Sequence, residues 1–140
     1  KSERWPLRFF PEMSREQAKM LSPLSLAFVG DAVYTLYARE KVIAASDAKN
    51  GALHAEATKS VRAAGQAVSA DAIIGMLTEE EAGVFRRAKN AKTHSVAKHA
   101  TLSDYKKATA FEALIGYLYL SGQEDRLKFL LKAREELCRE

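Results

Sequence analysis

Apolar residues recur at helical spacing along most of this chain, and no segment shows the sustained apolar and polar alternation that is typical of a strand. Residues that favour helices dominate the chain after residue 23, and all three prolines lie within the first 23 residues. The pattern therefore predicts an all-α fold. We expect one domain over residues 1–140, with an N-terminal extension of about residues 1–20.

Capping signals predict where several helices begin. Ser14 with Gln17 has the spacing of a capping box, and Thr78 with Glu81 repeats it. Ser22 precedes a proline that suits the first position of a helix. We expect helices to begin near residues 15, 23, 52, 79, 102 and 123.

Glycines and turn residues predict where helices stop or bend. The segment AASDAKNG at residues 44–51 predicts a turn that ends the second helix. Gly65 and Gly75 weaken the third helix, and we expect a bend or break near Gly65. The last helix should present an apolar face of Leu127, Leu130, Leu131 and Leu137.

The segments LAFVGDAVYTLY and ATAFEALIGYLYL are apolar on nearly every side, which is typical of buried helices. Each carries a single carboxylate, Asp31 in the first and Glu112 in the second. Each also contains one glycine, Gly30 or Gly116, at a cost of about 1 kcal/mol relative to alanine. We therefore predict that the two helices pack closely at their glycines and bring the two carboxylates together.

Two carboxylates in one apolar cleft repel each other, and a buried charge needs a partner. A hard divalent cation such as Mg²⁺, which takes oxygen ligands and keeps bound waters, would neutralise Asp31 and Glu112 together. Alternatively, each carboxylate pairs separately with a lysine or an arginine. The pattern of residues leaves both arrangements open.

The positive charge of the chain is concentrated in one stretch. The whole chain carries a net charge of +4, whereas residues 86–107 hold seven lysine and arginine residues against one aspartate. This basic excess, with His94 and His99 inside it, indicates a polyanionic partner. The alternative is a solvated charged loop.

The single cysteine, Cys138, has no partner within the chain, which is typical of a reducing compartment. No apolar run reaches the roughly 18 residues of a membrane span, and the first residues lack the apolar core of a signal peptide. We therefore expect a cytoplasmic protein that does not contact the membrane.

These motifs resemble those of a known family. LAFVGDAVYTLYARE is similar to the signature helix of the ribonuclease III family, and ATAFEALIGYLYL is similar to its second catalytic helix. The resemblance covers about residues 21–132. It is closest to the Mini-III branch, whose members have the catalytic domain without the double-stranded-RNA-binding domain that usually follows.

The resemblance implies a helical homodimer whose signature helices pack across a two-fold axis, and we expect Phe28 in that interface. It implies Mg²⁺-dependent cleavage of double-stranded RNA that leaves 5′-phosphate and 3′-hydroxyl ends, with Asp31 and Glu112 as catalytic residues and metal ligands. The Mini-III branch further implies maturation of the ends of the large-subunit (23S) ribosomal RNA precursor, assisted by a large-subunit ribosomal protein.

The basic stretch supplies cations that can hold duplex RNA by its backbone, because side chains cannot easily read the deep major groove of A-form RNA. The residues that we expect to contact RNA are Arg87, Lys89, Asn90, Lys92, Lys98 and His99.

Two acidic positions of the general family pattern are absent. Ala27 stands four residues before Asp31, and Thr109 stands three residues before Glu112. Their absence leaves open whether one or two metal ions bind. The alternative function is a non-catalytic RNA-binding or ribosome-assembly module on the same fold, and the retention of both Asp31 and Glu112 favours the enzyme.

Overall fold

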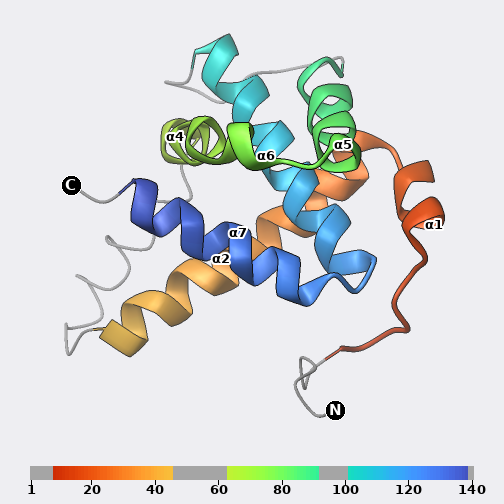
Figure 1. Ribbon diagram of the computed structural model, residues 1–140, viewed down its shortest axis with the longest axis horizontal. Helices are drawn as coiled ribbons and strands as arrows, with labels where there is room; N and C mark the ends of the chain where they lie inside the picture. The colour runs from red at the N-terminus through yellow and green to blue at the C-terminus, as the bar shows by residue number, and fades with distance from the viewer. Residues whose placement is uncertain (1–7, 46–62, 92–100, 139–140) are drawn as a thin grey trace.

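The structure, a computed structural model, describes residues 8–45, 63–91 and 101–138 (Figure 1). These residues form helices and no strand, which confirms the predicted all-α fold. No helix in this part of the chain is long and apolar enough to cross a lipid bilayer. In chain order the helices are α1 (Arg15–Met20), α2 (Pro23–Ala45), α4 (Ala63–Ile73), the 3₁₀ turn η1 (Ile74–Met76), α5 (Glu79–Lys89), α6 (Leu102–Leu120) and α7 (Glu124–Leu137).

Helix α6 is the central element of the core, and α2, α4, α5 and α7 all pack against it (Figure 1). Every residue from Ala108 to Leu118 is buried except Glu112. Because this helix is covered on nearly all sides, its all-round apolar sequence is explained by its position. The one carboxylate in its middle therefore lies at an opening in the core.

Helix α2 differs from α6, because only one of its faces is covered within the protomer. Its buried residues are Leu26, Ala27, Gly30, Tyr34 and Ala38. At 3.6 residues per turn these positions form a single stripe along the helix. The other side of α2 exposes large apolar side chains, so the prediction of a helix buried all round is only partly correct for the protomer.

The predicted capping boxes are confirmed at two helix starts. Ser14 Oγ accepts from Gln17 N, and Gln17 Oε1 accepts from Ser14 N, both at 3.0 Å. Thr78 and Glu81 form the same reciprocal pair before α5, at 2.9 and 3.1 Å. These bonds satisfy backbone N–H groups that a helix start otherwise leaves unpaired, so the boundaries follow from local sequence.

Glu81 has a second role that its position in the sequence does not reveal. Its buried carboxylate receives two hydrogen bonds from Arg126 of α7, at 2.8 and 2.9 Å. Arg126 also donates to the carbonyl of Met76 at 2.8 Å. This bidentate pair fastens the start of α5 to α7.

The segment before α1 runs back to the end of α6. The backbone N–H of Met13 donates to the carbonyl of Leu120 at 2.8 Å. Arg8 donates to the carbonyl of Tyr119 and pairs with the carboxylate of Glu124, each at 3.0 Å. These bonds hold residues 8–14 against the junction between α6 and α7.

The predicted bend or break near Gly65 stays a prediction. The helix expected from about residue 52 begins within residues 46–62, which lie outside the described residues, and α4 is described from Ala63 onward. A change to 3₁₀ geometry follows at the turn that contains Gly75. Leu137 is exposed at the end of α7, whereas Leu127, Leu130 and Leu131 are buried as predicted. The apolar face of α7 is covered along its first turns only.

Candidate active site

Helices α2 and α6 approach each other most closely at their glycines. A Cβ atom on Gly30 would collide with the carbonyl group of Glu112 and would lie 2.8 Å from the backbone nitrogen of Gly116. A Cβ atom on Gly116 would collide with the carbonyl of Leu26 and would lie 3.0 Å from the backbone nitrogen of Gly30. No larger residue fits at either position without separating the helices, so the predicted close packing at the glycines is confirmed.

This packing brings Asp31 and Glu112 together. A hydrogen bond joins their side-chain carboxyl groups. Burial, followed by this hydrogen bond and the nearby charge of Asp31, raises the pKa of Glu112 from 4.5 to about 8. Glu112 is therefore mostly protonated at neutral pH. The predicted juxtaposition of the two carboxylates is confirmed, and their roles in catalysis and metal binding remain predictions.

The two carboxyl groups lie in different environments. Asp31 is exposed in the protomer, whereas Glu112 is half-buried on the central helix. The apolar run around Asp31 therefore predicted the wrong environment for that residue, because the uncovered side of α2 begins beside it. One acid thus faces solvent while the other lies at the edge of the core.

Gln66 of α4 is a part of this site that the sequence analysis did not identify. Its side chain is 1% exposed and forms a hydrogen bond with Glu112. That bond lowers the pKa of Glu112, against the effects of burial and of Asp31, because an amide N–H favours the ionised carboxylate. The available signal was a lone glutamine within the small-residue run AAGQAVSA.

The two missing acidic positions do not supply replacement ligands. Ala27 is buried and has no polar side-chain atom. Thr109 is also buried, and its hydroxyl donates to the carbonyl of Tyr105, one turn earlier in α6, at 3.0 Å. Among the described residues, the carboxyl groups that meet in this part of the site are therefore those of Asp31 and Glu112.

The donor set suits a hard divalent cation that keeps much of its water. Within residues 8–45, 63–91 and 101–138, no group of three or more histidine, cysteine or acidic side chains could hold a metal ion. Two adjacent carboxylates that share a proton can exchange that proton for a cation. Mg²⁺ commonly binds through one or two carboxylates and retains several waters, so Asp31 and Glu112 fit it.

The predicted RNA-contacting residues are only partly within the described structure. Arg87, Lys89 and Asn90 are exposed at the C-terminal end of α5. Lys92, Lys98 and His99 lie outside the described residues. The structure therefore places half of this predicted set on one surface.

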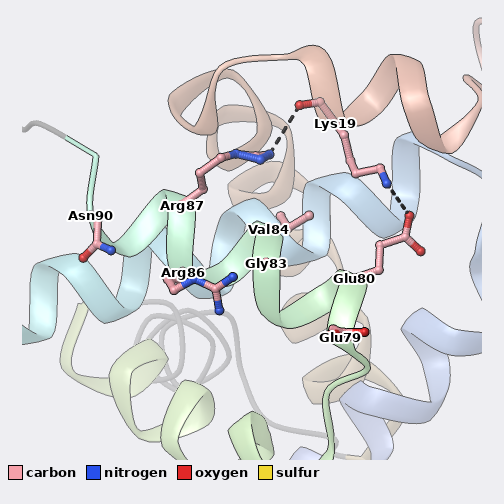
Figure 2. Close-up of a pocket in the computed structure, with 8 residues that line it drawn as sticks. All are labelled: Lys19, Glu79, Glu80, Gly83, Val84, Arg86, Arg87 and Asn90. Atoms are coloured by element: carbon pink, nitrogen blue, oxygen red, sulfur yellow. Dashed lines mark hydrogen bonds and ion pairs between the residues drawn. The ribbon is translucent and has the colours of Figure 1, made fainter.

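A groove of about 750 Å³ lies between α1 and α5 (Figure 2). Arg87 reaches across it and donates to the carbonyl of Lys19 at 3.3 Å, and Lys19 pairs with Glu80 at 2.8 Å. These bonds tie α5 to α1, so Arg87 also supports the fold. The residues that line the groove include neither Asp31 nor Glu112.

Phe28, which we predicted to lie in a dimer interface, is 81% exposed in the protomer. It belongs to a row of exposed apolar side chains on α2. The others are Leu24, Leu36 and Ile43. This α2 apolar row lies on the side of the helix that faces away from α6.

Sequence and structure comparisons agree on one family. The family model for the ribonuclease III domain matches residues 24–123. Mini-ribonuclease 3 of Thermoanaerobacter sp. is 43% identical over 128 residues, which cover 91% of this chain and 90% of that protein. Mini-ribonuclease 3 of Brevibacillus brevis is 47% identical over 116 residues, which cover 83% of this chain and 86% of that protein.

A crystal structure of a Fusobacterium nucleatum protein matches this fold with a TM-score of 0.75 at 33% sequence identity. The match covers 79% of this chain and 90% of that one. The chain therefore belongs to the ribonuclease III family of endoribonucleases, in its Mini-ribonuclease 3 branch.

Proposed function

We propose that this chain is a homodimeric, Mg²⁺-dependent endoribonuclease that cleaves double-stranded RNA at the Asp31–Glu112 pair. The observation that supports this most directly is the hydrogen bond between the two carboxyl groups. When both acids are ionised their charges repel, so in that state the pair costs stability unless a cation neutralises it. The pair is better explained as a site kept for a cation.

In the proposed site, Asp31 and Glu112 hold the Mg²⁺ ion through carboxylate oxygens. When bound, Mg²⁺ supplies an acidic water and stabilises negative charge on the phosphoryl group. Asp31 is exposed, so in this proposal it is the acid that meets the RNA first. Glu112 is fixed on the rigid central helix, so the pair keeps its geometry while substrate enters.

The α2 apolar row supports a dimer. Phe28 is 81% exposed, and Leu24, Leu36 and Ile43 extend the same surface. Several large apolar side chains exposed on one side of a helix are typical of an interface, and a self-complementary interface gives a two-fold dimer. The row borders the exposed Asp31 on α2, so a second protomer on it would place two acidic pairs near one RNA duplex.

The basic stretch supports binding of the RNA backbone. Lys89 and Asn90 are exposed where α5 ends, and Arg87 is exposed beside them. We propose that these residues contact phosphates and 2′-hydroxyls together with Lys92, Lys98 and His99, which lie outside the described residues. The substrate proposed from the branch resemblance is the 23S ribosomal RNA precursor, with a large-subunit ribosomal protein as partner.

The test is incubation of the protein with duplex RNA in Mg²⁺ and in chelator, followed by mapping of both ends of each product. We expect staggered cuts on the two strands, 5′-phosphate ends, and no cleavage without the metal. Single-stranded RNA of the same sequence serves as the control. A protein that binds the duplex but leaves it uncut in Mg²⁺ would instead be a non-catalytic RNA-binding module.

A further inference from the structure

Gln66 is a polar side chain buried in the apolar core. It is 1% exposed on α4, and its neighbour Ala67 is buried with it against the core. Burial of an amide costs free energy unless its groups find hydrogen-bond partners. An apolar residue of similar length would pack at this position without that requirement. The presence of glutamine here therefore calls for a role beyond filling the core.

The contact with Glu112 indicates that role. The Gln66 amide donates to the Glu112 carboxylate from α4, while Asp31 approaches the same carboxyl group from α2. A carboxylate held between an amide donor and a second acid has its rotation restricted on both sides. Groups that hydrogen-bond a metal ligand orient it and are often needed for full metal affinity.

Hydrogen bonds to other helices fix the position of α4, which carries Gln66. Ser69, one turn after Gln66, is fully buried and donates to the carbonyl of Gly65 at 3.1 Å. The same hydroxyl accepts a hydrogen bond of 2.7 Å from Arg134 of α7. This link fixes α4 to α7, so the position of the Gln66 backbone is set by the core and not by the site itself.

We propose that Gln66 is a positioning residue that holds the Glu112 carboxylate in the orientation that receives the metal ion. This inference rests on the proposed function, because it takes Glu112 as a metal ligand. It assigns to the site a third side chain that reaches the metal only through Glu112. Loss of Gln66 should therefore weaken metal binding while the RNA-binding surface is unchanged.

The test is Gln66→Met, which keeps the length and volume of the side chain and removes its donor. Binding of Mn²⁺ to the intact protein is measured directly by titration, and the Mg²⁺ concentration for half-maximal cleavage and the affinity for duplex RNA are measured beside it. We expect metal affinity to fall about 10- to 100-fold, with RNA affinity in chelator unchanged. Ser121→Ala is the control, because it removes a buried hydroxyl that bonds the carbonyl of Tyr117 at the far end of α6, more than two turns from Glu112.

The outcomes separate this inference from the proposed function. Wild-type metal affinity in Gln66→Met, or an equal loss in Gln66→Met and Ser121→Ala, would overturn the positioning role and leave the proposed function standing. A wild-type protein that neither binds metal nor cuts RNA would overturn both. If Gln66→Met does not fold, Gln66→Asn is judged by the same measurements, because its amide is one methylene too short to reach Glu112.

Discussion

Gly30 and Gly116 face each other where α2 crosses α6, so closely that a Cβ atom on either residue would lie within 3.0 Å of the backbone nitrogen of the other. The acids Asp31 and Glu112 lie beside this crossing, one residue after Gly30 and one turn before Gly116. The spacing of the two backbones therefore sets the spacing of the two carboxyl groups. The glycine pair is a structural requirement of the site.

Substitution of either crossing glycine should damage both stability and the site. Gly30→Ala or Gly116→Ala should reduce the free energy of unfolding by about 1–3 kcal/mol or more, because the added carbon meets backbone that cannot move aside cheaply. Gly83→Ala is the control, since a Cβ atom there has its nearest contact 4.0 Å away, and it should be neutral or stabilising. Urea denaturation of the three variants measures this. Equal stability of all three would show that the helices do not meet at their glycines.

Removal of the Asp31 charge should abolish cleavage without unfolding the protein. Asp31→Asn keeps the volume and loses a metal ligand, so the rate of RNA cleavage should fall by orders of magnitude while duplex binding survives. In chelator at neutral pH its melting temperature should stay close to that of the wild type, because the asparagine oxygen can still accept the Glu112 proton, and above pH 8 it should exceed that of the wild type, because repulsion between two ionised acids is relieved. Asp125→Asn, which changes an exposed acid on α7, is the control and should cut normally.

The alternative of a structural ion pair makes the opposite prediction for the same variant. If Asp31 neutralised a buried lysine or arginine, Asn would leave that cation unpaired and destabilise the protein by about 3–5 kcal/mol. Among the described residues, neither Asp31 nor Glu112 forms an ion pair with a cation. An Asp31→Asn protein that melts far lower and still cuts RNA at the normal rate would end the catalytic assignment.

The metal-free protein should become less stable as the pH rises through the neutral range. The pKa of Glu112 is about 8 in the folded protein and near 4.5 when unfolded, so between these values the folded state binds more protons. The stability contributed by protonated Glu112 is fully present below pH 4.5 and is lost as the pH rises to 8. Glu112→Gln should flatten this dependence in urea denaturation with chelator. An unchanged slope would mean that Glu112 has an ordinary pKa.

A charge placed in the α2 apolar row should split the proposed dimer. Phe28→Glu should give a monomer at micromolar concentration by light scattering, because the charge would be buried in the interface. Phe129→Glu is the control, since Phe129 is 53% exposed on α7 and lies outside the row. It should remain dimeric. A wild-type protein that is itself monomeric at this concentration would remove the dimer proposal.

The basic stretch should contribute to RNA affinity by binding phosphates. Replacing Lys89, Lys92 and Lys98 together with alanine should weaken duplex binding and reduce the slope of log affinity against log salt by about 0.9 for each phosphate that is no longer neutralised. Folding should be little affected. Unlike the triple lysine variant, Arg87→Ala should also lower the melting temperature, because the bond from Arg87 to the carbonyl of Lys19 ties α5 to α1. Unchanged binding and salt slope in the triple variant would show that this stretch does not contact RNA.

Features set by neighbouring residues could be predicted well from the sequence. The capping pairs Ser14–Gln17 and Thr78–Glu81 lie within one helical turn, so their bonds depend on local geometry alone. The all-round apolar run of α6 also correctly indicated the central helix. Gly30 and Gly116 pointed to the crossing because glycine in a helix interior is costly and needs a compensating contact.

Features that depend on which helices meet were decided only by the tertiary structure. Nothing in the order of residues places Gln66 of α4 beside Glu112 of α6. Nothing in LAFVGDAVYTLY or ATAFEALIGYLYL shows that Asp31 is exposed while Glu112 is half-buried. An apolar helix can cover its faces within the protomer, as α6 does, or leave one free, as α2 does. The same apolar sequence suits both arrangements, because removing apolar side chains from water is favourable whichever surface covers them. The arrangement of the acids was thus encoded locally in residue type, and their environment was set by how the helices pack.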